Sequence, residues 1–155
     1  MNRRLGCPCR GCWSSRGATY WVGSRPVVQL SARGCTDDRL WFALFHELGH
    51  VLLDKQSKRT FIELKDQQDS SAEETAADDF ARDTLIPPEE YRSFVDGRTR
   101  FSRQDVSAFA RRIGIAQGVV VGRLQHDGHL PMSHLNALKR RIPWQWLEGK
   151  SLPGL

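Results

Sequence analysis

The first patterned segment of the chain is that of a β-hairpin. Residues 18–22 and 26–30 are rich in β-branched and aromatic side chains, which is typical of strands. The residues between them, 23–25, are few enough to form a hairpin turn. An extended peptide can add to the free edge of such a hairpin. We therefore expect a small sheet ahead of the helices.

The most apolar stretch of the chain, residues 41–53, predicts a helix. It contains no proline, and apolar side chains surround its few polar ones, so we expect this helix to be buried. Residues 36–38, with the sequence Thr-Asp-Asp, are N-cap candidates, and the helix is expected to begin near Arg39.

A second helix is predicted over residues 70–86. Serines open it, acidic residues fill its first turn, and the two prolines at 87–88 end it. Its apolar positions fall at i, i+3, i+4, i+7 and i+8 and form one helical stripe. These positions are Ala77, Phe80, Ala81, Thr84 and Leu85.

The C-terminal part of the chain predicts several short elements with apolar faces. Ser102 and Asp105 have the spacing of a capping box, and Gly114 suits the end of the helix that they begin. We expect short helices at 89–95, 102–113 and 133–139, an apolar run at 119–124 and a turn at 126–128.

Length and composition indicate one soluble domain. The chain has 155 residues, and we expect residues 18–155 to form a single domain after a disordered leader at 1–17. No run approaches the roughly 18 apolar residues of a membrane span. The basic start lacks the apolar core of a secretory signal. A cytoplasmic protein without membrane contact is therefore expected, and in that reducing compartment its four cysteines would not form a disulfide framework.

Three of the cysteines, Cys7, Cys9 and Cys12, form a C-x-C-x-x-C run, and Cys35 lies beyond it. Familiar zinc sites use two separated cysteine pairs, which are absent here, so we do not expect a second metal site.

The net charge of +5 is distributed unevenly along the chain. Residues 1–40 hold seven Arg against two Asp, residues 41–100 hold eight basic against thirteen acidic residues, and residues 101–155 hold eight against three. A basic segment is more commonly a solvated face than a nucleic-acid surface. Residues 103–125 have a spacing similar to a helix-turn-helix, but two glycines weaken the second helix, so direct nucleic-acid binding is not expected.

The predicted helix over 41–53 contains the motif H-E-x-x-H at residues 46–50. His46 and His50 stand four residues apart, so their imidazoles project from one face of the helix. Two nitrogens so placed can bind one Zn²⁺ at about 2.0–2.1 Å each. Glu47 would then lie beside the metal and could take a proton from the zinc-bound water. Polar groups on an apolar helix are costly without partners, and a metal supplies one.

The second predicted helix offers a third ligand. Glu74 follows His50 by 24 residues, enough chain for a loop that returns to an antiparallel helix. Asp78 lies one turn further and could accept the other ring N–H of a ligating histidine.

The same acids also suit helix capping, because Ser70 with Glu73 and Ser71 with Glu74 both fit the S-x-x-E box. If Ser70 and Glu73 form the box, Glu74 remains available for zinc, and the two interpretations coexist.

Several segments together resemble the ImmA/IrrE metallopeptidases, over roughly residues 18–145. They are R-P-V-V-Q-L-S at 25–31, W-F at 41–42, H-E-L-G-H at 46–50, E-x-x-A-D-x-F-A at 74–81, L-I-P-P-E at 85–89 and the segment 113–125. The resemblance implies a zincin-like α+β fold, in which a small β-sheet packs on an active-site helix bundle. It also implies one zinc per chain, held by His46, His50 and Glu74, with Glu47 as catalytic base and Asp78 behind the ligands.

Members of that family typically cleave repressors of phage, mobile-element or stress genes. The resemblance therefore implies a zinc-dependent endopeptidase that cleaves a regulatory partner protein, a DNA-binding repressor or an antitoxin. The alternative is a non-proteolytic, zinc-containing regulatory module of a toxin–antitoxin or repressor system. Mn²⁺ or Fe²⁺ would also suit two histidines and a glutamate. The candidates for stabilising the oxyanion are Tyr91, His126, His129 and His134.

Overall fold

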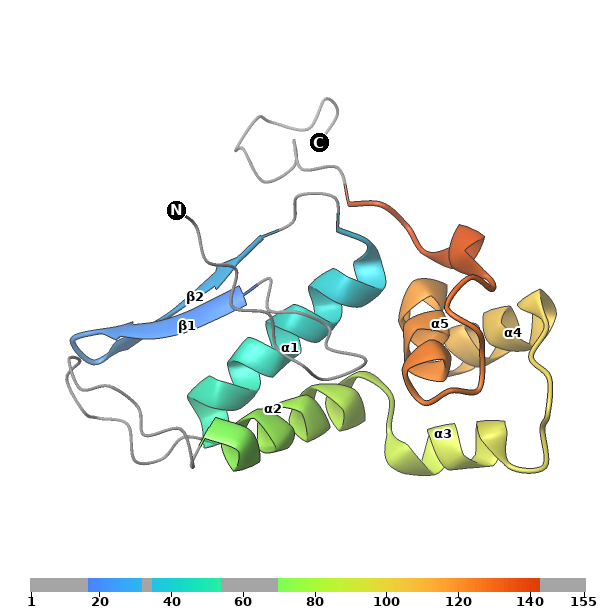
Figure 1. Ribbon diagram of the computed structural model, residues 1–155, viewed down its shortest axis with the longest axis horizontal. Helices are drawn as coiled ribbons and strands as arrows, with labels where there is room; N and C mark the ends of the chain where they lie inside the picture. Colours follow the sequence, from blue (N-terminus) through green and yellow to red (C-terminus); the bar gives the residue numbers. More distant parts are fainter. Residues whose placement is uncertain (1–16, 32–34, 54–69, 143–155) are drawn as a thin grey trace, which may run out of the picture.

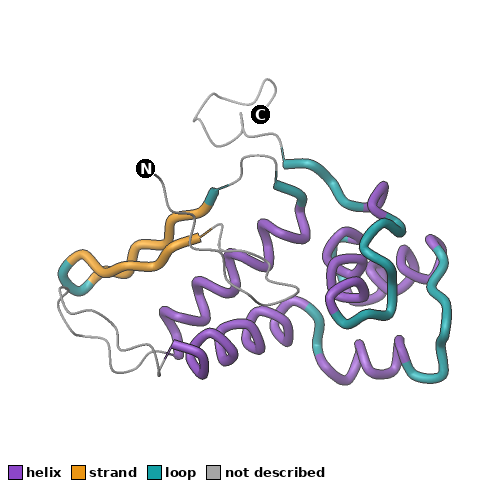
Figure 2. The backbone as a smooth tube through the Cα atoms, in the orientation of Figure 1, coloured by secondary structure: helices purple, strands orange, loops and turns teal. Residues whose placement is uncertain are grey.

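The computed structural model describes residues 17–31, 35–53 and 70–142 (Figure 1). Within these ranges a two-stranded sheet precedes a set of helices (Figure 2). The elements are β1 (Gly17–Val22), β2 (Arg25–Leu30), α1 (Asp37–Leu53), α2 (Ser70–Leu85), α3 (Pro88–Val95), α4 (Arg103–Ile113), α5 (Gln117–His126) and the 3-10 helix η1 (Asn136–Leu138). The predicted α+β class, with a small sheet beside the helices, is confirmed.

Strands β1 and β2 form the expected antiparallel hairpin. Val22 pairs with Arg25, so the turn consists of Gly23 and Ser24 and is one residue shorter than predicted. Gly23 has a φ of 62°, which two-residue hairpin turns favour and which glycine adopts without strain. Residue 17 belongs to β1 and not to the leader, while residues 1–16 lie outside the described part of the chain.

Helix α1 is the central element, because it packs against α2, both strands and α5. It begins at Asp37, two residues earlier than predicted, so Asp37 and Asp38 lie inside its first turn. Both acids are buried, at 3% and 1% exposure, because the neighbouring α5 and the chain near Arg140 cover them.

The expectation that α1 is buried throughout is wrong. Glu47 and Gly49 are buried, but Trp41 and Leu52 are 44% and 57% exposed. Among the described elements, α1 packs against α2, α5 and the two strands, and these leave Trp41 and Leu52 uncovered. Apolar composition therefore overstated the burial of this helix.

Helix α2 lies along α1 in the opposite direction (Figure 1). The two backbones approach most closely at Gly49, where an added Cβ would lie 3.0 Å from Cα of Ala77. Ala77 and Ala81 of the predicted apolar stripe are buried there, whereas Thr84 is exposed. The side chains of Ser70 and Ser71 lie outside the described residues, so the two capping-box alternatives stay predictions.

The main hydrophobic core lies among α3, α4 and α5. The apolar faces predicted for the helices at 89–95 and 102–113 are confirmed, and the apolar run at 119–124 forms part of helix α5. Phe94 of α3 stacks on Phe109 of α4 with ring centroids 4.0 Å apart. Ser102 and Asp105 form the predicted capping box, and Gly114 ends α4 with a φ of 74°. The core residues are Ile86, Tyr91, Phe94, Phe101, Val106, Phe109, Ala110, Val119, Val120, Val121, Leu124, Leu130 and Leu138.

The expected helix over 133–139 is reduced to the single 3-10 turn η1. Leu135 has a φ of 57°, which an α-helix does not allow. In addition, Nε2 of the buried Gln125 donates hydrogen bonds to the carbonyl oxygens of Met132 and His134, at 3.2 and 2.8 Å. These oxygens would otherwise be available to helical N–H groups, so the loop is held in another conformation.

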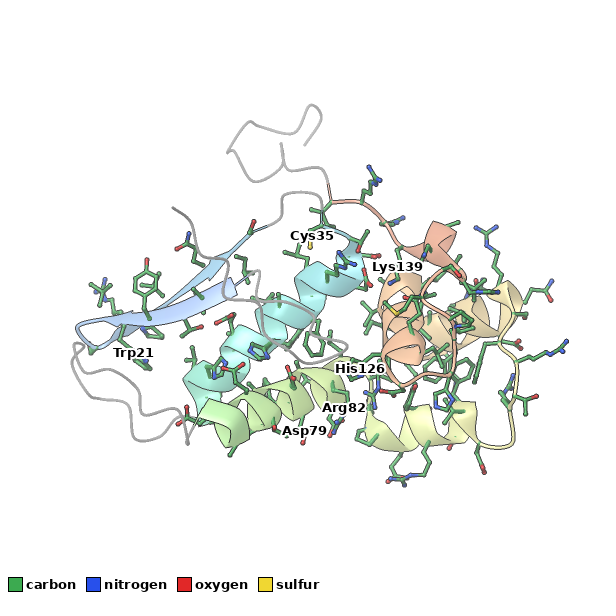
Figure 3. All side chains as sticks on the ribbon, viewed as in Figure 1. Trp21, Cys35, Asp79, Arg82, His126 and Lys139 are labelled. Atoms are coloured by element: carbon green, nitrogen blue, oxygen red, sulfur yellow. The ribbon has the colours of Figure 1, made fainter. Side chains whose placement is uncertain are left out.

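The segment after η1, residues 139–142, binds back to the start of α1, and we call it the clasp. Figure 3 shows Lys139 and Cys35 near the beginning of that helix. Lys139 Nζ lies 2.6 Å from Asp38 Oδ2, and the N–H of Arg140 donates to Asp37 Oδ1 at 3.0 Å. The N–H of Ile142 donates to the carbonyl of Cys35 at 3.0 Å. Segments far apart in the sequence are thereby joined.

Candidate metal centre

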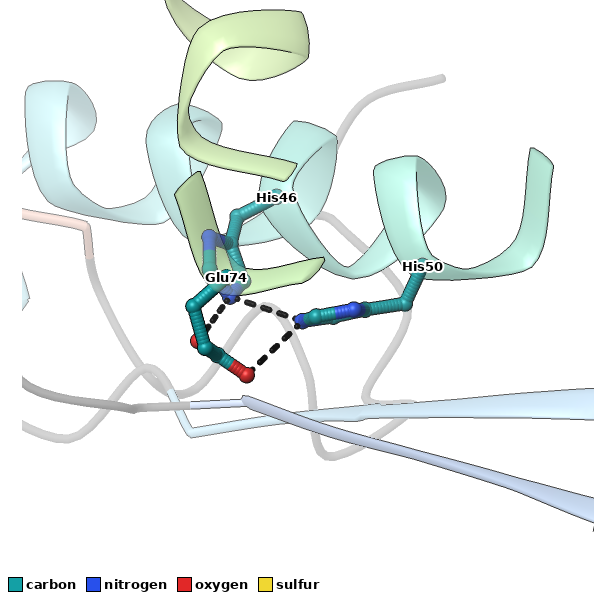
Figure 4. A group of neighbouring side chains, drawn as sticks. All are labelled: His46, His50 and Glu74. Carbon is teal, nitrogen blue, oxygen red and sulfur yellow. Dashed lines mark hydrogen bonds and ion pairs between the residues drawn. The ribbon is translucent and has the colours of Figure 1, made fainter. Parts of the chain in front are cut away.

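Three side chains from two helices converge at one point between α1 and α2 (Figure 4). His46 and His50 project from one face of α1 as their spacing predicts, and their Nε2 atoms lie 3.0 Å apart. Glu74 of α2 faces both of them. Its Oε2 lies 3.4 Å from Nε2 of His46, and its Oε1 lies 3.4 Å from Nε2 of His50.

The separations suit a single tetrahedral metal ion. Bonds of 2.0–2.1 Å in a tetrahedral arrangement would place the ligand atoms about 3.3–3.4 Å apart, close to the separations observed. The histidine side chains are 18% and 21% exposed and Glu74 is 56% exposed, so the group is open on one side. No other cluster of this kind occurs in the described ranges.

Asp78 fixes the orientation of His46. Its Oδ1 lies 2.7 Å from Nδ1 of His46, and a carboxylate can only accept, so Nδ1 carries the hydrogen. In the neutral ring the lone pair of Nε2 is then left pointing toward His50 and Glu74, as a metal ligand requires. The hydrogen bond to Asp78 raises the pKa of His46 against the opposing effect of burial.

Glu47 follows His46 on α1 and is turned toward the sheet. It is 6% exposed, and Oγ1 of Thr19 donates to its Oε2 at 2.6 Å. The strand lies so close that an added Cβ on Gly17 would meet the carboxylate of Glu47. Gly17 and Thr19 were missed from the sequence. Their i, i+2 spacing, which places them on one face of a strand, was the only signal.

The four oxyanion candidates lie in different places. Tyr91 is buried beneath the guanidinium of Arg123, 4.3 Å from its ring, and His129 packs edge-on against Tyr91. His134 is exposed in the loop before η1. Only His126 of these four lines the cavity that also includes Asp78. The structure therefore does not gather the four around the three converging side chains.

The family profile of the IrrE N-terminal-like domain (Peptidase M78) matches residues 11–125. The chain belongs to this peptidase family. Among the described elements, the match covers both strands, helices α1 to α4 and α5 up to Gln125, and it confirms the resemblance to the ImmA/IrrE proteins. Membership in this family supports a metallopeptidase-type function and a protein substrate. No curated protein and no solved structure matches the chain significantly.

None of the described helices of this IrrE-like domain combines the length and apolar character needed to cross a membrane. Helix α5, which a helix-turn-helix would place in the major groove, has seven of its ten residues buried. A recognition helix must be exposed, so α5 has no face for that role.

Of the cysteines, Cys35 is buried, and the other three lie outside the described residues.

Proposed function

We propose that this IrrE-like domain is a zinc-dependent endopeptidase that cleaves a regulatory protein, a repressor or an antitoxin. The observation that carries the proposal is the convergence of His46, His50 and Glu74 beside the buried carboxylate of Glu47. Zinc bound by these three residues would polarise the scissile carbonyl and lower the pKa of a water. A cytoplasmic location stays a prediction.

Asp78, Glu47 and Thr19 would orient the ligand His46 and carry out the proton transfers. Asp78 holds the ring of His46 so that Nε2 faces the ion. Glu47 would take a proton from the attacking water and pass it to the leaving amine. Thr19 holds this carboxylate through a hydrogen bond to Oε2 and so restricts its orientation.

The second candidate is a regulatory module that holds zinc and binds its partner without cleaving it. The three ligands suit either function, because a structural zinc needs the same donors. Glu47 distinguishes the peptidase from the regulatory module. It is not one of the three converging side chains, yet it is buried and hydrogen-bonded to Thr19. A site without chemistry has no use for a carboxylate held in this way, so we favour the peptidase.

The first experiment measures metal content in the purified wild type, in Glu74→Ala and in Glu73→Ala. Glu73 is the neighbouring exposed glutamate of α2 and serves as the matched control. We expect about one zinc per chain in the wild type and in Glu73→Ala, and loss of the ion in Glu74→Ala. Folded wild type without stoichiometric metal, after loading with Zn²⁺, Mn²⁺ or Fe²⁺, would overturn the proposal.

The second experiment incubates repressors and antitoxins from the same genome with the zinc-loaded wild type and with Glu47→Gln. We expect the wild type to cleave one of them, and Glu47→Gln to retain zinc without cleaving. Tight binding of a partner that neither protein cleaves would decide for the regulatory module.

A further inference from the structure

A cavity lies between α1, α2 and α5 and continues the metal centre along the two ligand-bearing helices. Phe42, one of its walls, precedes His46 by four residues, which is about one helical turn or 5.4 Å along the axis. Asp78, which holds the ring of His46, is also a wall. Arg82 of α2 and His126 of α5, both labelled in Figure 3, line the cavity further along. The cavity therefore lies next to His46, on the side of its ring that contacts Asp78.

The apolar part of the wall comes from several elements. Phe42 belongs to α1, Leu85 to the end of α2, Ile86 to the link that follows, and Val119 to α5. Burial of apolar surface in such a site contributes about 25 cal/mol per Å². The cavity therefore favours a ligand group that leaves water readily.

Most of the charged side chains of the wall already have a partner of opposite charge, so a charged ligand group would find little free counter-charge there. Asp38 pairs with Lys139 (2.6 Å), Arg82 with Asp83 (2.8 Å) and Arg123 with Asp127 (2.6 Å). The carboxylate of Asp78 accepts the Nδ1 hydrogen of His46 at 2.7 Å.

We infer that this cavity receives an uncharged, apolar side chain of the peptide substrate, from a residue that flanks the scissile bond. The inference rests on the proposed function, since it takes the metal centre as the place of cleavage. Successive residues of an extended peptide are about 3.3 Å apart, so a residue beside the scissile bond reaches one helical turn from the ligands. The cavity thus selects the substrate by the side chain next to the cleaved bond.

The test begins with a randomised decapeptide library, digested by the zinc-loaded wild type and sequenced by mass spectrometry. Matched peptides that differ only at the selected position then carry Ala, Leu, Asp or Lys. We expect kcat/KM for the leucine peptide to exceed that for the alanine peptide about tenfold, and to exceed those for the charged peptides by more. Cleavage with no preference at any position next to the bond would overturn the inference.

Two variants of Leu85 locate that preference in the cavity. Leu85→Trp fills it and should lower kcat/KM for the leucine peptide about tenfold while the alanine peptide changes little. Leu85→Ala enlarges the cavity and should shift the preference toward phenylalanine. This variant gives a result even if Leu85→Trp does not fold. Ile113→Trp and Ile113→Ala are the matched controls, because Ile113 packs on the same core but is not a cavity wall. Unchanged peptide ratios in Leu85→Ala would contradict the inference.

A binding measurement separates this inference from the proposed function. Zinc-loaded Glu47→Gln is titrated with the fluorescently labelled leucine, alanine and lysine peptides. If the leucine peptide binds most tightly and Leu85→Ala removes that preference but the wild type cleaves nothing, the cavity does bind the side chain and it is the proposed function that fails. If the wild type cleaves peptides but Glu47→Gln binds all three equally, only the cavity inference fails.

Discussion

The carboxylate of Asp78 on α2 contacts the imidazole of His46 on α1 through Oδ1 and Nδ1, 2.7 Å apart. This contact joins the two helices at the candidate metal centre, and it settles which nitrogen of His46 faces His50 and Glu74. Residues behind a ligand in this way influence metal affinity without touching the metal.

Replacing Asp78 by alanine should therefore weaken metal binding by about 10- to 100-fold. The ring of His46 would lose the acceptor that fixes its tautomer. Competition with a chromophoric chelator measures the affinity. Asp79→Ala is the control, because Asp79 pairs with Arg82 and not with a ligand. Equal affinities of the two variants would show that the Asp78 contact does not orient the ligand.

Thr19→Val should lower the rate of cleavage by about tenfold while leaving the zinc content unchanged. The hydroxyl of Thr19 donates to Glu47 Oε2 at 2.6 Å, and valine has the same shape without the donor. Steady-state kinetics should place the loss in kcat and not in KM. Thr19→Ser, which keeps the hydroxyl, should retain most of the activity. A loss in both variants would point to packing instead.

Gly49→Ala should lower the free energy of unfolding by about 1–3 kcal/mol, the usual cost of overpacking. The new Cβ would lie 3.0 Å from Cα of Ala77, so α2 would have to move and carry Glu74 away from the histidines. Urea denaturation and metal titration measure both effects. The double variant Gly49→Ala/Ala77→Gly removes the methyl group 3.3 Å from that Cβ and should recover part of the stability. No recovery would mean that the strain lies elsewhere.

Lys139→Met should lower the free energy of unfolding by about 3–5 kcal/mol, because it leaves the buried carboxylate of Asp38 without its counter-charge. Adding Asp38→Asn to that variant should restore much of the loss. Chemical denaturation of the two variants and of the exposed neighbour variant Arg140→Met makes the comparison. If the double variant is no more stable than Lys139→Met, the lysine contributes through packing of its side chain.

The capping box of α4 should make stability depend on pH. Hydrogen bonds from Ser102 hold the pKa of Asp105 below its usual value. The ionised acid therefore favours the folded state above its unfolded pKa of about 3.9, and this contribution is lost as the pH falls through the folded pKa. Asp105→Ala should be less stable than the wild type at pH 7, and the difference should shrink below about pH 4. Gln104→Ala should show a difference that does not vary with pH.

Much of the fold was predictable because its signals are local. The double proline after α2, the capping pair before α4 and Gly114 after it each act within one turn of a helix. The histidine pair was predictable for the same reason, since residues four apart always lie on the same face of a helix. Their convergence with Glu74 required only that α2 return beside α1.

Contacts between distant segments were not predictable. No local pattern indicates that Thr19 would reach Glu47, or that Lys139 would reach Asp38. The exposure of Trp41 was also missed, because an apolar residue reports its preference for burial and not whether another element covers it. The start of α1 was misplaced for a related reason, since its two acids are covered by α5 and the clasp.

The clasp also implies an order of assembly for the newly made chain. Arg140 and Asp37, which it joins, are 103 residues apart. At a synthesis rate of about 5–20 residues per second, the start of α1 leaves the ribosome roughly 5–20 s before its partner segment. During that interval the hairpin, α1 and α2 can meet, and the metal ligands with them. Asp38 gains its partner Lys139 only later, so a nascent chain can bring its proposed metal ligands together seconds before the wall of its cavity is complete.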